Sequence, residues 1–139
     1  MFSSIVSAAD WTGWRPDLTH WVIALGDQPH LRVSTLQQLL TCARDHPHQI
    51  CQPSLRGQRK HPVILPRRFF KLLPGANAVT LKDFLQSHPA EIKTAEATDS
   101  GLGLDLDTPE DYARALRFGP AGAHPQWLRN AAPNRQCSS

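Results

Sequence analysis

The sequence predicts an α/β fold with a parallel or mixed sheet. The first observation is an unbroken apolar run at residues 21–25, Trp-Val-Ile-Ala-Leu, which is typical of a strand buried on both faces. The second is the helical spacing of apolar residues that begins at Ser34. The third is that strand-like segments, at residues 63–65 and 92–97, alternate with further helical patterns. With 139 residues the chain suits one domain that buries a real core.

The segments around the first strand are expected to be a helix, a loop and a turn. Residues 1–9 place apolar side chains between serines, which favours a short helix. Residues 10–19 hold a glycine, a proline and two tryptophans, so they predict a loop. The strand of residues 20–25 stops at Gly26, where we expect a tight turn and a close backbone approach. Pro29 then ends strand pairing, because it has no N–H to donate.

An amphipathic helix is expected to follow that turn. Ser34 and Gln37 fit the capping-box pattern, which places the start of the helix at Ser34. The residues of its expected apolar stripe are Leu36, Leu39, Leu40 and Ala43. Cys42 lies beside this stripe and is interpreted as a packing residue rather than a nucleophile. Pro47 closes the helix.

Short strands and helices make up the middle of the chain. Residues 50–52 and 63–65 read as strands, with a polar, basic loop over residues 53–62 between them. Residues 67–73 predict a helix, which Pro74 and Gly75 break. A second helix is expected to begin at Thr80, whose side chain caps it, with Asp83 at the third helical position. Its inward-facing residues are expected to be Leu81, Phe84 and Leu85.

The acidic segment near the carboxyl end predicts a last strand and a last helix. Residues 102–107 read as a strand in which Asp105 and Asp107 lie two apart, and therefore on one face. Thr108 is expected to cap the following helix, with a proline at its first position and Asp111 at its third.

Composition favours a cytoplasmic protein that does not enter the membrane. No run approaches the roughly 20 apolar residues that a membrane helix needs, and the first residues lack the basic stretch of a signal peptide. The three cysteines are odd in number and not in metal-ligand spacing, which indicates a reducing compartment without a disulfide framework. We expect one domain over residues 1–117 and a mostly disordered tail over residues 118–139.

Charge is unevenly distributed along the chain, although the net charge is only +3. Residues 46–82 contain seven basic residues and no acid, whereas residues 83–111 contain eight acids and one base. If the fold brings the two segments together, an anion-attracting wall would face carboxylates, as suits a phosphate ligand with a metal ion. The alternative is two oppositely charged solvated faces. The small net charge and the lack of interleaved aromatic residues argue against nucleic-acid binding.

Asp27 is the first-choice functional residue, because ligands of open α/β sheets lie at the carboxyl ends of the strands. Magnesium prefers carboxylate oxygens, so Asp27 and either Asp105 or Asp107 would together suit a Mg²⁺ site. The alternative for Asp27 is a turn acid that hydrogen-bonds its own backbone. The alternative for Asp107 is a capping role at the start of the last helix.

Three motifs, taken in order, resemble those of a known family. They are Leu-Gly-Asp-Gln-Pro at residues 25–29, Arg-Lys-His-Pro-Val-Ile-Leu-Pro-Arg at residues 59–67, and Asp-Leu-Asp-Thr-Pro-Glu-Asp-Tyr at residues 105–112. Together they are similar to the MobA-like nucleotidyltransferases, and among these most similar to the molybdenum cofactor cytidylyltransferases. The resemblance extends from about residue 1 to residue 116.

The resemblance implies a three-layer α/β/α, Rossmann-like nucleotidyltransferase fold with a mixed, mostly parallel sheet. It also implies an enzyme that joins a nucleoside triphosphate, CTP rather than GTP, to a molybdopterin-type phosphate. Such enzymes release pyrophosphate and use Mg²⁺.

The resemblance also assigns residue roles. Asp27 would act as a metal ligand and catalytic residue, with Asp105 or Asp107 as the second metal ligand. His61 would be a catalytic residue in the loop on the acceptor side. The residues expected to contact the substrates are Gly26, Gln28, Pro29, Arg59 and Lys60.

Two departures from the family pattern affect the expected activity. Lys60 stands where the family usually has a glycine before His-Pro, which would change that loop or add a phosphate contact. Nothing resembles the family's first strand and glycine-rich triphosphate loop, so we expect an N-terminally truncated domain that starts at an internal methionine. Such a chain would keep the metal carboxylates and the acceptor side but lack most of the triphosphate binding. The alternative is a non-catalytic module that binds a phosphorylated small molecule. An exposed sheet edge would favour dimerisation or aggregation.

Overall fold

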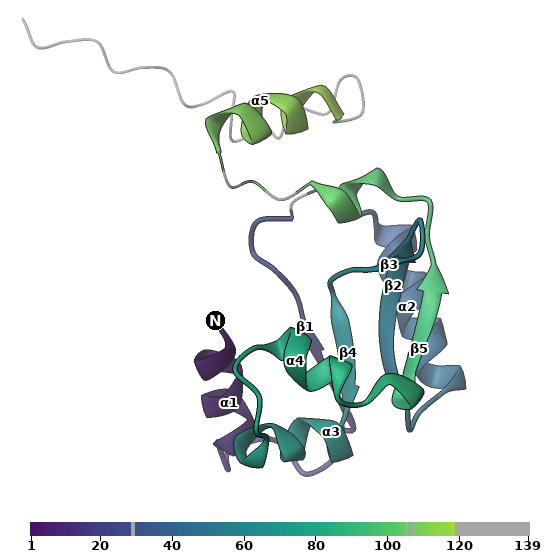
Figure 1. Ribbon diagram of the computed structural model, residues 1–139. Coiled ribbons are helices and arrows are strands. Elements are labelled where there is room, and N and C mark those ends of the chain that lie inside the picture. The colour runs from purple at the N-terminus through teal and green to yellow at the C-terminus, as the bar shows by residue number, and fades with distance from the viewer. Residues whose placement is uncertain (29, 105, 107, 119–139) are drawn as a thin grey trace, which may run out of the picture. The chain divides into compact units, whose positions relative to one another are not determined.

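The computed structural model describes residues 1–28, 30–104, 106 and 108–118. It divides into two compact units, residues 1–105 and residues 106–139. The first unit contains the sheet and most of the helices, and the second contains α5 (Pro109–Phe118). The predicted tail from Gly119 onward lies outside the described residues (Figure 1).

Five strands form one mixed sheet. They are β1 (His20–Ile23), β2 (Ile50–Leu55), β3 (Gln58–Arg59), β4 (Val63–Pro66) and β5 (Ile92–Glu96). β4 pairs antiparallel with β1 and with β2, β3 forms an antiparallel pair with β2, and β5 pairs parallel with β2. Consequently β1, β2 and β5 run in one direction and β4 runs in the other. Figure 1 shows β1, β4, β2 and β5 side by side in that order.

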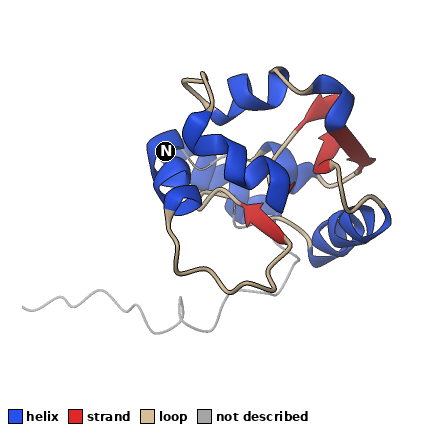
Figure 2. Cartoon of the chain, turned by 90° about the horizontal axis from the view of Figure 1, so that it is seen from below, coloured by secondary structure: helices blue, strands red, loops and turns tan. Residues whose placement is uncertain are grey.

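Helices cover both faces of this sheet, which confirms the α/β class. The helical segments of the first unit are α1 (Phe2–Asp10), α2 (Val33–Asp45), α3 (Arg67–Leu72), η1 (Leu73–Gly75), α4 (Leu81–Gln86), η2 (Pro89–Glu91) and η3 (Ser100–Gly103), where η marks a 3₁₀ helix. α2 packs on β2 and β5, whereas α3 packs on β1 and β4 (Figure 1). Figure 2 shows how helices surround the strands. No helix of the described part is long and apolar enough to cross a bilayer.

The two faces of the sheet have separate cores, because successive strand residues point to opposite faces. Ile50, Val63 and Leu65 belong to the larger core, beneath α1, α3 and α4. Cys51 and Ile64 point the other way and belong to the smaller core beneath α2. Thus neighbouring residues of β2 and β4 anchor different helical layers.

Several local sequence signals are confirmed by the structure. The helix at the amino terminus, the short strand β4, helix α3 and strand β5 lie where the sequence predicts them. Thr80 caps α4, since its Oγ1 accepts a 3.1 Å hydrogen bond from the backbone N–H of Asp83. Thr108 caps α5 in the same way, with a 3.2 Å hydrogen bond from the N–H of Asp111.

The position of β1 differs from the prediction of a strand buried on both faces. β1 lies at the sheet edge, and β4 is its only partner among the described strands. The side chain of Val22 is 53% exposed. An apolar run therefore need not be central: α3 covers one face of β1, while the face that carries Val22 is open.

The start of α2 also differs from the prediction. The helix begins at Val33, its N-cap is Arg32, and no side chain of the cap residue makes a capping hydrogen bond, so the Ser34 capping box is wrong. The buried residues of α2 are Thr35, Leu39 and Ala43. Leu40, which the prediction placed in the core, is 57% exposed. A tertiary contact with Asp99, described below, holds this end of the helix instead.

The expected basic loop over residues 53–62 is partly a β-hairpin. β2 continues to Leu55, and Ser54 pairs with Arg59 of β3. The turn between them uses Arg56 and Gly57, whose φ angles are 53° and 77°. Glycine adopts such positive φ values without strain, so Gly57 permits the tight reversal that extends the strand.

The predicted last strand is wrong in its described part. Residues Ser100–Gly103 form the 3₁₀ helix η3, because the side chain of Asp99 accepts a 2.9 Å hydrogen bond from the N–H of Gly101 and starts a turn. The expectation that Asp105 and Asp107 share a strand face falls on residues outside the described part.

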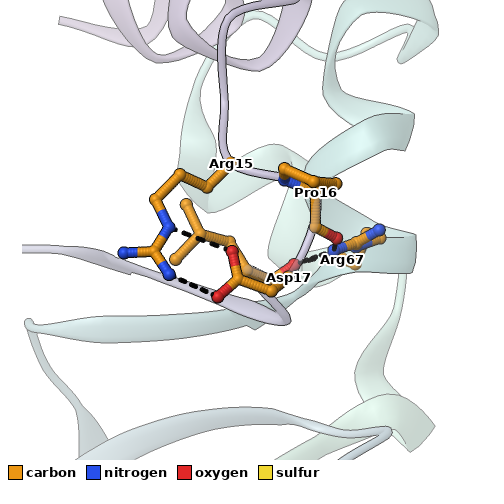
Figure 3. A network of polar contacts seen from close by, with 5 residues as sticks. Arg15, Pro16, Asp17 and Arg67 are labelled. Carbon is orange, nitrogen blue, oxygen red and sulfur yellow. Dashed lines mark hydrogen bonds and ion pairs between the residues drawn. The ribbon is translucent and has the colours of Figure 1, made fainter.

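Arg67 holds the loop that precedes β1 (Figure 3). Its Nε donates a 2.9 Å hydrogen bond to the carbonyl of Leu18, and its Nη2 donates a 2.5 Å hydrogen bond to the carbonyl of Pro16. The same loop carries an exposed 2.6 Å ion pair between Arg15 and Asp17. Arg67 therefore ties the start of α3 to the loop that leads into β1.

Candidate functional site

Asp27 lies in the turn directly after β1, at the carboxyl end of that strand. The residue is half-buried, and its Oδ1 is buried with no hydrogen-bond partner among the described residues. Burying a carboxylate oxygen without a partner costs free energy, and a bound cation relieves that cost. This oxygen does not make the local backbone hydrogen bond that the alternative for Asp27 required.

A second carboxylate, that of Asp99, holds the segment that follows the Asp27 turn. Oδ2 of Asp99 accepts a 2.9 Å hydrogen bond from the backbone N–H of Arg32 and a 2.7 Å hydrogen bond from Oγ1 of Thr35. The Arg32 guanidinium lies 3.7 Å from Oδ1. Asp99 is only 3% exposed, so a buried carboxylate replaces the missing cap at the start of α2.

The environment of Asp99 favours its charged form. Burial by itself raises the pKa of Asp99. The hydrogen bonds from Arg32, Thr35 and Gly101, together with the charge of Arg32, outweigh burial and hold the pKa of Asp99 below its ordinary value. The carboxylate therefore stays charged where it accepts these hydrogen bonds.

Gly101 permits a close backbone contact between the same two segments. A Cβ added at Gly101 would lie 2.3 Å from the carbonyl oxygen of His30, so no larger residue fits without movement. The prediction had assigned a close backbone approach to Gly26. A Cβ at Gly26 would meet no described atom within 4 Å, so the predicted close backbone approach at Gly26 is wrong.

These contacts place residues 30–35, which follow the Asp27 turn, beside residues 99–101. His30 and Arg32 contact residues 99–101, and residues 105–107 follow only a few positions later. Asp99 was missed by the sequence reasoning. The Asp-Ser-Gly pattern at residues 99–101 was a usable signal for an acidic turn, although it does not identify the partner.

A basic cavity of about 570 Å³ lies beside the β2–β3 hairpin and α4. Its lining residues are Gln52, Gly57, Gln58, Arg59, Lys60, His61, Lys82, Leu85 and Gln86. Three of them are cationic and none is acidic, so the cavity attracts anions. The expected anion-attracting wall is therefore present, but no carboxylate lines it.

Two buried polar atoms of the cavity residues have no partner among the described residues. They are Oε1 of Gln52, whose residue is 4% exposed, and Nδ1 of His61. Nε2 of Gln52 donates a 3.4 Å hydrogen bond to the carbonyl of Lys60, which orients the amide. Buried polar atoms are normally hydrogen-bonded, so these two are candidates to contact a ligand.

The structure brings some predicted site residues together and separates others. Arg59, Lys60 and His61 line one cavity, as the motif suggests. Gly26, Asp27 and Gln28 lie in the turn after β1 and do not line it. Pro29, Asp105 and Asp107 are outside the described residues. Gln52 and Lys82 were missed, because their shared position depends on a strand and a helix that are distant in sequence.

Within the described part, no three His, Cys, Asp or Glu side chains gather in a way that would hold a metal ion. The unpartnered Oδ1 of Asp27 nevertheless fits one ligand position of a hard cation. Mg²⁺ typically takes one or two protein carboxylates and fills its other positions with water and phosphate oxygens, so one such oxygen is compatible with its chemistry.

Comparison with protein families supports the relationship that the motifs suggested. Residues 1–92 match the family model for the MobA-like NTP transferase domain. The chain belongs to this family. The matched range includes the Asp27 turn and the whole basic cavity, and it ends before the acidic segment that contains Asp105 and Asp107.

A solved structure shows the same fold. The crystal structure of a homolog of Mycobacterium tuberculosis Rv0371c, from Mycobacterium sp. strain JC1, matches this chain with a TM-score of 0.66 and 27% sequence identity. The match covers 83% of this chain and 56% of that protein, so the chain spans little more than half of its length. No curated protein matches the sequence.

Proposed function

We propose that this protein serves nucleotidyl transfer: the CMP group of CTP passes to a molybdopterin-type phosphate and pyrophosphate leaves. The observation that carries the proposal is the buried, unpartnered Oδ1 of Asp27 at the carboxyl end of β1, in a chain of the MobA-like family. Preference for CTP over GTP rests on the motifs, which are most similar to those of the cytidylyltransferase branch.

Asp27 would hold a Mg²⁺ ion, with Asp105 or Asp107 as the second protein ligand. For Asp105, the support is that the hydrogen bonds of Asp99 to Arg32 and Thr35 hold residues 32–35, a few positions after Asp27, against Asp99, a few positions before residue 105. When bound, the ion would neutralise charge on the nucleotide phosphates during in-line attack. The chain itself contributes a carboxylate oxygen that is already desolvated and without another partner.

The basic cavity would bind the phosphate of the acceptor. Arg59, Lys60 and Lys82 supply positive charge there, and none of them has an ion-pair partner among the described residues. An arginine offers a planar pair of donors to phosphate, and a lysine offers a compact charge. His61 and Gln52 would complete the hydrogen bonds to the rest of the acceptor.

The alternative function is non-catalytic binding of a phosphorylated small molecule. The basic cavity favours it, because every lining residue belongs to the first unit and none comes from the acidic segment. In that case the protein would bind the acceptor without turning over a nucleotide.

A pyrophosphate-release assay separates the two functions. The protein is incubated with Mg²⁺, molybdopterin and either CTP or GTP, beside the Asp27→Asn variant. Release with CTP that is lost in the variant supports nucleotidyl transfer by this chain. No release from this chain, but release from a version extended upstream through a glycine-rich loop, means that the triphosphate site requires that segment. If neither version releases pyrophosphate but this chain still binds molybdopterin, the result supports non-catalytic binding.

We also propose that the chain associates with a second copy through the open edge of β1. The support is the exposed Val22, the lack of a second strand partner for β1 in the described part, and an apolar cavity of about 320 Å³ beside that edge. An unpaired strand edge offers backbone hydrogen bonds to another strand.

A further inference from the structure

Two cysteines meet between the second helix and the sheet. Cys42 lies in the second half of α2 and Cys51 lies in β2, and their Sγ atoms are 3.4 Å apart. Both belong to the smaller core, and neither forms a disulfide bond. A disulfide bond requires a separation of about 2.05 Å, so the two sulfur atoms need to approach by a little over 1 Å.

We propose that Cys42 and Cys51 are a modification site: a hydroperoxide oxidises them to a reversible intrachain disulfide bond that links α2 to β2. The pair carries this inference because the sulfur atoms are already in contact and each comes from a regular element, helix α2 or strand β2. No other residue needs to move between them.

The reaction balances with hydrogen peroxide as the oxidant. The thiolate of Cys42 attacks one peroxide oxygen, the O–O bond breaks, and the departing hydroxide takes up a proton to become water. The product is a sulfenic acid on Cys42. Sγ of Cys51 then attacks that sulfur, the S–O bond breaks, and the leaving hydroxide takes the proton of Cys51 as a second water. Two thiols are oxidised and one peroxide is reduced.

Burial assigns the order of the two steps. Cys42 is half-buried and is the more exposed of the two, whereas Cys51 is 0% exposed. Burial, helped by the hydrogen bond and the charge of Cys42, raises the pKa of Cys51 to about 12, although Lys93 acts in the opposite direction. Cys51 is therefore a neutral thiol at neutral pH, and it acts second, on a sulfur held against it.

The bond would connect the two parts of the candidate site. α2 begins at the Arg32 and Thr35 contacts with Asp99, which hold the segment after the Asp27 turn. Cys51 is followed directly by Gln52, which lines the basic cavity. Oxidation would thus link α2, which begins at the Asp99 contacts, to β2, which carries Gln52 of the basic cavity.

Mass spectrometry after exposure of the full chain to hydrogen peroxide tests the proposal. We expect the protein to lose the mass of two hydrogen atoms and to retain one titratable thiol, that of Cys137. Digestion with trypsin should yield peptides 33–44 and 45–56 joined to each other, and dithiothreitol should separate them. The Cys137→Ser variant should give the same joined peptides and retain no thiol.

Matched variants make the result decisive. In Cys42→Ser, which alters a half-buried residue, Cys51 should remain a thiol under conditions that fully oxidise the wild type. Cys51→Ala should leave Cys42 as a sulfenic or more highly oxidised acid. The proposal is overturned if Cys42 and Cys51 stay thiols, if they oxidise separately to sulfinic acids, or if the joined peptides contain Cys137.

Discussion

The carboxylate of Asp99 accepts a 2.9 Å hydrogen bond from the backbone N–H of Arg32, a residue 67 positions earlier in the chain. This contact joins the segment after the Asp27 turn to the segment that precedes residue 105. It also substitutes for a local cap at the start of α2. Asp99 therefore positions one part of the candidate site without being part of it.

Replacing Asp99 should reduce stability more than replacing another acid. In Asp99→Asn we expect a loss of about 2 kcal/mol in the free energy of unfolding at pH 7, because hydrogen bonds to a buried charged acceptor are lost. Urea titration measures the loss. The Asp45→Asn variant is the control, because Asp45 is exposed and Arg44, at 3.5 Å, is its only ion-pair partner among the described residues. An equal loss in both variants would contradict this role.

The effect of Asp99 should depend on pH. Its pKa is lowered in the folded state, so its contribution is present above the ordinary pKa of aspartate, about 4, and is lost as pH falls through the folded value. The stability difference between wild type and Asp99→Asn should therefore shrink below about pH 4. Urea titrations at several pH values measure it. A difference that stays constant into acid would refute the lowered pKa.

Gly101→Ala should disturb the junction with His30. The added methyl would lie 2.3 Å from a backbone carbonyl oxygen, and we expect a loss of about 1–3 kcal/mol in the free energy of unfolding. Gly75→Ala is a matched control, because a Cβ there meets nothing within 4 Å and should change stability by less than about 0.5 kcal/mol. Thermal denaturation compares the two variants.

Asp27→Asn should separate function from stability. Since Oδ1 of Asp27 has no partner among the described residues, removal of its charge should leave the unfolding midpoint unchanged or slightly raised. Nucleotide turnover, measured as pyrophosphate release, should fall by roughly 10²-fold or more. Asp17→Asn, which removes only an exposed ion pair, should alter neither quantity. A strong loss of stability in Asp27→Asn would indicate a structural role.

Lys82→Gln should weaken the binding of anions in the basic cavity. Loss of one charge-assisted hydrogen bond predicts roughly tenfold weaker binding of the molybdopterin-type phosphate, measured by calorimetry. Lys93→Gln removes the same charge from exposed β5, outside the cavity, and should bind as the wild type does. Equal weakening in both variants would mean that only net charge matters.

Val22→Lys should prevent association through the edge of β1. A charged side chain on an edge strand opposes pairing with another chain, so light scattering should show a smaller average mass than for the wild type. Val79→Lys is the control, because Val79 is 85% exposed and lies outside the sheet. A wild-type chain that is a monomer at all concentrations would contradict the proposed association.

Much of the local structure follows from neighbouring residues. The Thr80–Asp83 and Thr108–Asp111 caps involve partners three residues apart, so the sequence pattern suffices to predict them. The strand at residues 63–66 follows equally from its own apolar run. The motifs also sufficed to identify the family, because the type and order of their residues are retained.

Only the tertiary structure decided how the site is built. Asp99 replaces the predicted Ser34 cap, Gln52 and Lys82 meet in one cavity, and the apolar run around Val22 lies at an edge. Arg32 and Asp99 are tens of residues apart in the sequence, and so are Gln52 and Lys82. The exposure of β1 depends on a second neighbouring strand, which the described sheet does not contain. Periodicity and capping rules act over one or two turns, whereas burial and hydrogen bonding depend on which segments the folded chain brings into contact.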